Sequence, residues 1–275
     1  MNRKEPLFRV VKRESSSPVR QALAYVAAVV IALLIGAALL SSMDVDPLTF
    51  YQKMVTMGIP GNKFPWRIVE NFVKLFVPLL ITSLALSLAF RMRFWNIGGE
   101  GQFIMGAICA AAAAHKLGPV LPQPLVVLVM ALCGILGGGL YGLIVALLKV
   151  RYNTNETLLT LMLNYIALYM IKFLREGPWR DPTSTAFPQI AMFGDNARLD
   201  NVFGVHAGWI LALVLVALVF VYTRYTKHGF EIAVVGESEN TARYAGMNVK
   251  KIVMRTMFIS GGICGIAGMC QVAGT

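Results

Sequence analysis

Apolar runs long enough to cross a lipid bilayer constrain this 275-residue chain more than any other feature. A transmembrane helix needs about 20 apolar residues to cross a hydrocarbon core of roughly 30 Å. Hydrophobic residues make up 57% of the sequence and charged residues 14%, whereas soluble domains average about 45–50% and 25%. We therefore predict an all-α protein, a polytopic transmembrane helical bundle with about seven spans. The predicted spans are 21–40, 72–90, 103–114, 125–148, 158–173, 209–222 and 257–273.

The charge distribution assigns sides to the connecting segments. A net charge of +11, from 25 Lys and Arg against 14 Asp and Glu, would suggest nucleic-acid binding in a soluble chain. Here the basic residues lie between apolar runs, and the preference of positive charge for the cytoplasmic side explains them without a nucleic acid. We predict that the basic segment 1–20 is cytoplasmic and that 21–275 is the transmembrane domain. Its outer loops are then 44–65 and 176–208, and its long cytoplasmic loop is 224–256.

Glycines recur at a spacing that favours close helix packing. Three of them recur at every fourth residue within the predicted span 125–148, and two repeat this spacing within the predicted span 257–273. In lipid, small residues on one helix face let two backbones approach closely. The predicted packing glycines are Gly134, Gly138, Gly142, Gly261 and Gly265.

Polar residues stand at the start of two short apolar runs. The run 103–114 offers roughly 18 Å of helix and follows the glycine-rich polar stretch 94–102. The run 158–173 follows a second polar stretch and carries an asparagine inside it. Polar groups within a bilayer are costly, and short, glycine-interrupted segments are typical of transport pathways. The candidate pathway residues are Asn96, Glu100, Gln102, Asn155, Glu156 and Asn164.

A simpler interpretation of the same residues stays open. The segments 91–101 and 149–156 can be plain cytoplasmic turns, in which Asn96 and Asn155 cap the helices that follow. Asn164 can equally form a hydrogen bond between two helices.

The long loop 224–256 contains the start and stop signals of a short helix. Ser238 is a good N-cap, Glu239 suits the first turn, and Gly246 suits the position after the last turn. A helix of about two turns is not stable alone. Either a partner protein or the neighbouring spans must brace it.

Motifs for metal binding, cofactor binding and catalysis are missing from the sequence. The four cysteines lie in apolar runs without a CxxC spacing, and the three histidines are scattered, so we expect neither disulfides nor a metal site. The sequence has no G-x-x-x-x-G-K-[ST] motif for binding nucleotide phosphates. We therefore expect that the chain is not an enzyme.

Several motifs together resemble a known family. They are the segment NIGGEGQ at 96–102, Asn155-Glu156 followed by LMLNY at 161–165, GPWRDP at 177–182, and ARYAGMN at 242–248 ahead of Ser260-Gly-Gly. In this order they resemble the permease subunit of ABC importers for simple sugars and nucleosides, which is related to ribose and branched-chain amino-acid permeases. The resemblance covers roughly residues 20–275.

The resemblance implies partners and a mechanism. Such permeases pair with an identical or a different permease chain in the bacterial inner (plasma) membrane. They receive solute from an extracytoplasmic binding protein, which the 177–182 loop would face. ABC ATP-binding subunits drive them, so ATP and Mg²⁺ belong to a partner and this chain would bind no cofactor. Family members usually continue for further spans, and we expect this chain to be C-terminally incomplete.

The resemblance also assigns a role to the short helix. The stretch 238–246 looks like the coupling helix that docks into a groove of the ATPase. The expected coupling residues are Ser238, Glu239, Asn240, Arg243, Tyr244 and Gly246.

Two other function classes are considered. An ion-coupled secondary transporter would need intramembrane carboxylates, and apart from Glu100 and Glu156 the predicted spans offer few. A membrane-embedded enzyme or assembly factor would need a catalytic grouping that the sequence does not show.

Overall fold

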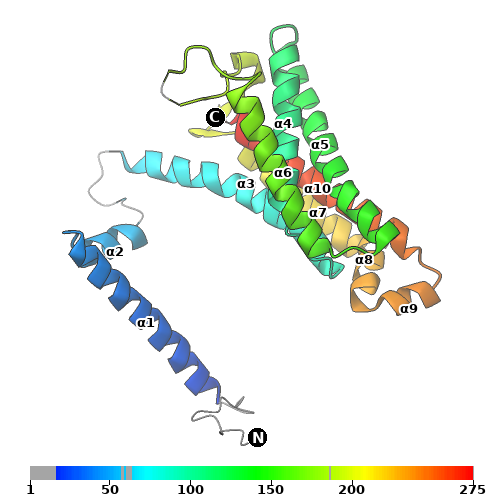
Figure 1. Ribbon diagram of the computed structural model, residues 1–275, viewed down its shortest axis with the longest axis horizontal. Coiled ribbons are helices and arrows are strands. Elements are labelled where there is room, and N and C mark those ends of the chain that lie inside the picture. Colours follow the sequence, from blue (N-terminus) through cyan, green and yellow to red (C-terminus); the bar gives the residue numbers. More distant parts are fainter. Residues whose placement is uncertain (1–16, 57–58, 60–63, 186, 275) are drawn as a thin grey trace, which may run out of the picture. The chain divides into compact units, whose positions relative to one another are not determined.

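The computed structural model describes residues 17–56, 59, 64–185 and 187–274. It divides into two compact units, Met1–Ile68 and Val69–Thr275 (Figure 1). Most of the predicted cytoplasmic segment 1–20 lies outside the described residues.

The first unit contains two helices. Helix α1 (Pro18–Ser42) starts behind Ser17, and α2 (Pro47–Val55) starts behind Asp46, whose side chain accepts hydrogen bonds from the backbone N–H groups of two α2 residues. The Tyr51 hydroxyl in α2 donates to the Leu33 carbonyl at 2.8 Å and folds α2 back onto α1. Helix α1 is apolar along its length and long enough to cross a membrane.

The regular structure that the described residues of the second unit form is helical, apart from one short hairpin and an isolated bridge between Arg180 and Ile190. Its hairpin pairs β1 with β2 in antiparallel register within the loop after α6. Its helices and strands are α3 (Pro65–Arg91, which begins before the unit's boundary), α4 (Gly99–Leu117), α5 (Gln123–Tyr152), α6 (Glu156–Glu176), the single 3₁₀ turn Asp195–Ala197, β1 (Asn201–Val202), β2 (Val205–His206), α7 (Gly208–Tyr225), α8 (Lys227–Glu237), α9 (Glu239–Tyr244) and α10 (Val249–Ala273).

The prediction of an all-α polytopic bundle is confirmed. Among the described residues, six helices are long and apolar enough to cross a membrane: α1, α3, α5, α6, α7 and α10. Each contains one predicted span. The seventh predicted span, 103–114, lies inside α4, a helix of 19 residues that is not among the six. Helix α4 is longer than predicted because the polar stretch Gly99–Gln102 forms its first turn.

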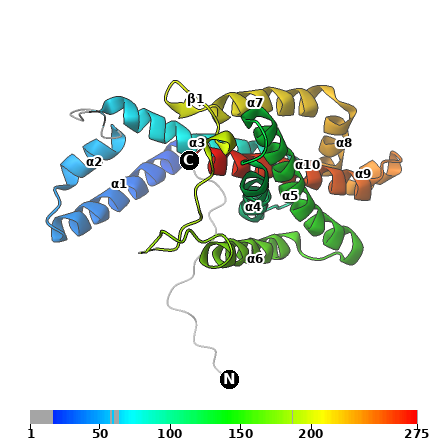
Figure 2. The ribbon, with the colours of Figure 1, turned by 90° about the horizontal axis from the view of Figure 1, so that it is seen from above.

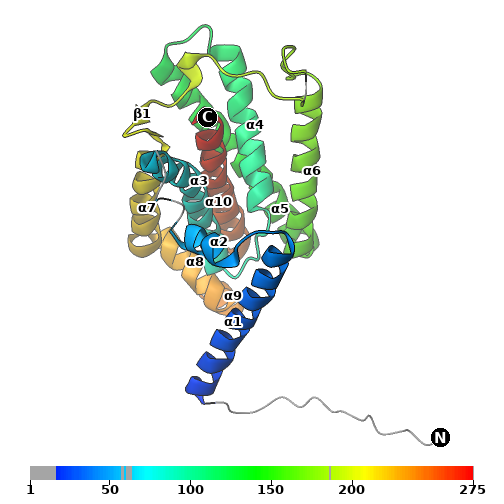
Figure 3. The ribbon, with the colours of Figure 1, turned by 90° about the vertical axis from the view of Figure 1, so that its left-hand side faces the viewer.

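Helix α10 is the central element of the second unit. It runs between α3 on one side and α4 and α5 on the other (Figures 1 and 3). Its most apolar window is 72% buried, whereas the other candidate spans reach at most 33%. Figure 2 shows α8 and α9 at one end of α10, with the chain's last residues at its other end.

Glycines allow α10 to approach its neighbours closely. A Cβ atom at Gly138 of α5 would lie 2.2 Å from the Gly261 carbonyl oxygen, and one at Gly265 of α10 would lie 1.9 Å from the Gly134 carbonyl oxygen. A Cβ atom at Gly142 would lie 2.7 Å from the Met257 carbonyl oxygen. The glycines predicted for packing thus form one seam, which we call the glycine seam, between α5 and α10.

Candidate functional site

The turn between α3 and α4 is folded into the end of the bundle. Asn96 is fully buried and Gln102 is 1% exposed. Their carboxamides bind each other, with Asn96 Nδ2 donating to Gln102 Oε1 at 3.2 Å and Gln102 Nε2 donating to Asn96 Oδ1 at 3.3 Å. Asn96 Oδ1 also accepts from the backbone N–H of Gly98 at 3.0 Å. These bonds satisfy the polar groups that would otherwise be costly to bury.

Asn164 joins this turn to α6. Its Oδ1 accepts from the backbone N–H of Gly101 at 2.8 Å, and its Nδ2 donates to the Ile97 carbonyl at 3.0 Å. The close approach requires glycine, because a Cβ atom at Gly101 would lie 2.8 Å from Asn164 Oδ1 and one at Gly98 would lie 3.0 Å from Thr160 Cβ. We call Asn96, Gln102 and Asn164 the polar latch, since together they hold the start of α4 against α6.

The other candidate pathway residues have different surroundings. Glu100 lies in the first turn of α4, is exposed, and has no ion pair within the described residues. Asn155 caps α6 by accepting from the N–H groups of Thr157 and Leu158 at 3.0 and 3.2 Å. Glu156 forms an ion pair of 2.7 Å with Lys149. The six residues therefore divide into a buried latch, one exposed carboxylate and one capped helix start.

The segments 92–98 and 153–155 are turns between helices, and the polar residues that follow each of them form the first turn of the next helix. The chain leaves α3 at Arg91 and enters α4 at Gly99, and it leaves α5 at Tyr152 and enters α6 at Glu156. Neither stretch interrupts a helix. Figure 1 shows both turns at the same end of the second unit as α8 and α9.

Loss of the hydrogen bonds of the polar latch is expected to destabilise the folded protein. The change Asn164→Leu removes both partners of the Gly101 N–H and the Ile97 carbonyl, and each buried group left unpaired costs about 1–3 kcal/mol. We expect a clearly lower unfolding temperature in detergent than for Tyr165→Leu, which changes an exposed neighbour on the same helix. Equal unfolding temperatures for the two variants would show that these hydrogen bonds do not hold the bundle end together.

The short helix α9 lies where the sequence predicts it. Ser238 caps it by accepting from the Thr241 N–H at 3.3 Å, and Gly246 follows with a φ of +75°, a conformation that favours glycine. Ala242 is buried, whereas Tyr244 is 94% exposed. Asn240 is exposed, and Glu239 forms a partly exposed ion pair of 3.3 Å with Arg243.

Sequence reasoning missed α8, which braces α9. Helix α8 starts behind Thr226, whose hydroxyl accepts from the Gly229 N–H at 3.2 Å. Two features of the sequence indicate this helix: Thr226 as an N-cap, and the helical spacing of the apolar residues Ile232 and Val235. These two side chains are buried in one apolar cluster with Ala242 of α9. The cluster also contains Val249, Ile252, Val253 and Met257 of α10 and Ala89, Met92, Phe94, Val145 and Ala146.

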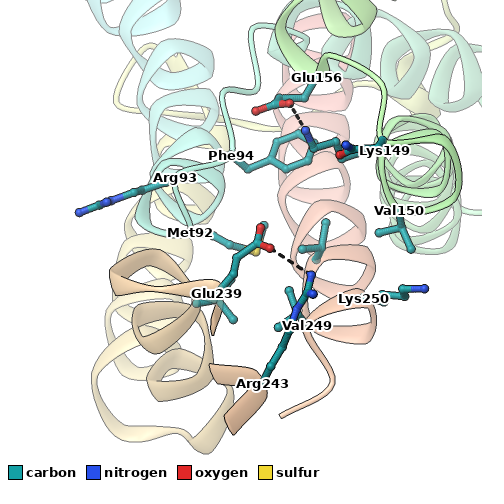
Figure 4. Close-up of a pocket in the computed structure, with 13 residues that line it drawn as sticks. Met92, Arg93, Phe94, Lys149, Val150, Glu156, Glu239, Arg243, Val249 and Lys250 are labelled. Carbon is teal, nitrogen blue, oxygen red and sulfur yellow. Dashed lines mark hydrogen bonds and ion pairs between the residues drawn. The ribbon is translucent and has the colours of Figure 1, made fainter. Parts of the chain in front are cut away.

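A cavity of about 390 Å³ opens beside α9 (Figure 4). The Lys149–Glu156 pair lies on one wall and the Glu239–Arg243 pair on the other, with Phe94 between them. Figure 4 also shows the Arg93 and Lys250 side chains directed away from the cavity. Sequence reasoning did not single out Arg93, Lys149 or Lys250 as site residues, because basic residues between apolar runs indicate cytoplasmic loops and turns.

Metal-binding groups are not assembled in this region. Within the described ranges, no three His, Cys, Asp or Glu side chains gather closely enough to hold a metal ion. The site is an arrangement of hydrogen bonds, ion pairs and one exposed short helix.

Comparison with known proteins identifies the chain's relatives. Residues 68–275 match the family described as branched-chain amino acid transport system / permease component. The chain is 29% identical over 260 residues to the glucose ABC transporter permease protein of Haloferax volcanii, covering 90% of this chain and 67% of the relative. It is 32% identical over 219 residues to the guanosine ABC transporter permease protein of Bacillus subtilis, covering 75% of this chain and 60% of the relative.

A third relative, the nucleoside ABC transporter permease protein of Lactococcus lactis subsp. cremoris, is 26% identical over 261 residues, covering 91% of this chain and 70% of the relative. The matches thus span about two thirds of the relatives' own lengths. No solved structure matches the chain.

Proposed function

The chain belongs to the branched-chain amino acid transport system permease family of ABC transporters, and from this membership we propose that it forms part of the import pathway for a nucleoside or a simple sugar. As a permease component it is a multi-pass membrane protein without a catalytic role of its own, so ATP hydrolysis falls to a partner subunit. We place it in a bacterial plasma membrane with its α8–α9 end in the cytoplasm, beside a second permease chain that completes the pathway.

The proposed solute class rests on the relatives. Two of the three relatives described above are named for guanosine or nucleoside transport and one for glucose transport. Nucleosides and simple sugars share a hydroxylated ring that hydrogen-bonding side chains can recognise. An extracytoplasmic binding protein would deliver the solute to the opposite end of the bundle, where the loop between α6 and α7 lies.

The single observation that carries the proposed mechanism is the geometry of α9. A helix of six residues is not stable alone, yet here Ala242 is buried beneath it while Arg243 and Tyr244 are exposed. An exposed, rigidly backed helix is suited to receive force from a partner. We propose that the ATP-binding subunit docks on α9 and the adjacent cavity, and that its closure moves α9 and switches the pathway between its two sides.

The polar residues at the bundle end would take part in the pathway. We propose that Glu100, which is exposed and has no ion pair within the described residues, lies at the inner mouth of the pathway. Asn96, Gln102 and Asn164 already bind one another and the backbone, which supports a role in holding the start of α4 in place. Asn155 and Glu156 would hold the start of α6 at the same mouth.

Co-purification tests the docking role of α9. The change Arg243→Glu reverses an exposed charge beside the cavity and places a second carboxylate next to Glu239, so we expect at least a tenfold loss of the ATP-binding subunit retained by the tagged chain. The matched control is Arg175→Glu, because Arg175 pairs with Glu176 at 3.5 Å in a similarly exposed ion pair at the other end of α6. Equal retention of the ATP-binding subunit by both variants would refute docking at α9.

A further inference from the structure

One ion pair ties the α8–α9 segment to a predicted span. Arg255 Nη2 of α10 lies 2.8 Å from Glu231 Oε2 of α8, and the two side chains are only 24% and 15% exposed. Within the described ranges, three of the other ion pairs join residues at most four positions apart, and the fourth, Lys149–Glu156, joins the end of α5 to the start of α6. The Glu231–Arg255 pair joins residues 24 positions apart.

The surroundings of Glu231 favour the ionised form of its carboxyl group. The hydrogen bond from Arg255 lowers the pKa of Glu231, against the opposing effect of burial, and the positive charge of Arg255 and of Lys227 and His228 adds to this lowering. Tyr222 of α7 lies on the same side, with its ring 6.1 Å from that of His228. A charge-assisted hydrogen bond in partly buried surroundings is stronger and more directional than an exposed one.

The pair lies on the contact route from α9 to the centre of the bundle. Helix α9 follows α8 after the single residue Ser238, and Gly236 of α8 packs so closely on α3 that a Cβ atom there would lie 2.1 Å from the Arg91 carbonyl oxygen. The apolar cluster around Ile232 also links α8 to α10. Apolar contacts are non-directional and permit sliding, whereas an ion pair fixes one register between two helices.

We propose that Glu231 and Arg255 are a positioning pair that makes α8–α9 and α10 move as one body. This inference rests on the proposed function, in which the ATPase drives α9. Movement of α9 would then reach the glycine seam, because α10 carries both Arg255 and the seam residues Gly261 and Gly265. Without the pair, α8 and α9 would shift on the end of α10 and part of the movement would be lost.

The number of solute molecules taken up per ATP hydrolysed tests this proposal. In proteoliposomes that contain the complete transporter, we expect Glu231→Gln and Arg255→Gln each to retain the ATP-binding subunit and its hydrolysis but to lower this ratio tenfold or more. The double exchange Glu231→Arg with Arg255→Glu is expected to restore most of it. Glu176→Gln, which breaks the exposed pair at the far end of α6, is expected to leave the ratio unchanged.

The outcomes separate this inference from the proposed function. If the unaltered chain retains no ATP-binding subunit, the proposed function itself fails. If the unaltered complex transports solute and both single variants keep its ratio, the positioning role is wrong. A purely structural role predicts that uptake and hydrolysis fall together at a constant ratio. If the single variants do not fold, the double exchange Glu231→Arg with Arg255→Glu tests the proposal instead. A ratio of solute uptake to ATP hydrolysis far below that of the unaltered complex would then overturn it.

Discussion

Replacing Gly265 by alanine is expected to remove most of the folded protein. A Cβ atom at this position would lie 1.9 Å from the carbonyl oxygen of Gly134, and a Cβ atom at Gly106 of α4 would lie 2.2 Å from the Gly265 Cα. Helices α4, α5 and α10 therefore meet backbone to backbone at Gly265. Because no flexible side chain can give way, one added methyl group must separate the helices and remove the van der Waals contacts that hold them in lipid.

The matched control lies one turn away on the same helix. At Gly262 a Cβ atom would meet the Ile135 side chain at 3.2 Å, and that side chain can shift slightly. Alanine also has a higher helix propensity than glycine, by up to about 1 kcal/mol, so we expect Gly262→Ala to leave the stability of the folded protein nearly unchanged. The yield of monodisperse protein and its unfolding temperature in detergent measure both variants. If Gly265→Ala is as stable as Gly262→Ala, the glycine seam is not a close backbone contact in the protein.

The features that depend on residues close together in the chain could be predicted from the sequence. Apolar runs of bilayer length predicted six of the candidate spans, and the spacing of Gly134, Gly138 and Gly142 predicted a packing face. Ser238 and Gly246 marked the limits of α9 because capping depends on residues only a few positions apart.

The features that the sequence missed depend on distant partners. The hydrogen bond between Gly101 and Asn164 joins residues 63 positions apart, and no periodicity reveals which helix receives that carboxamide. The polar residues at the start of α4 led to the prediction that its span begins only at 103, whereas hydrogen bonds from Gln102 to Asn96 and from Gly101 to Asn164 of α6 hold residues 99–102 as the first helical turn. In the sequence, Arg255 was one of the basic residues that assigned the loop 224–256 to the cytoplasm. Its ion pair with Glu231 forms only because α8 folds beside α10.

Solute transport through this chain is expected to depend completely on ATP hydrolysis by the partner subunit. The chain's family places it in ABC transporters, and α9 is the exposed helix on which we propose that the ATP-binding subunit docks. On the proposed function, solute should therefore not move without ATP hydrolysis by the partner subunit. We expect solute uptake in the presence of ATP and no uptake when ATP is replaced by a non-hydrolysable analogue.

Uptake of labelled guanosine and glucose by proteoliposomes tests this central claim most directly. The vesicles would contain this chain with its partner permease and ATP-binding subunits, and the solute-binding protein would be added outside. The account predicts uptake of at least one of the two solutes with internal ATP and Mg²⁺, and none with the non-hydrolysable analogue or with an ion gradient alone. Uptake driven by an ion gradient in the absence of ATP would contradict it and identify a secondary transporter.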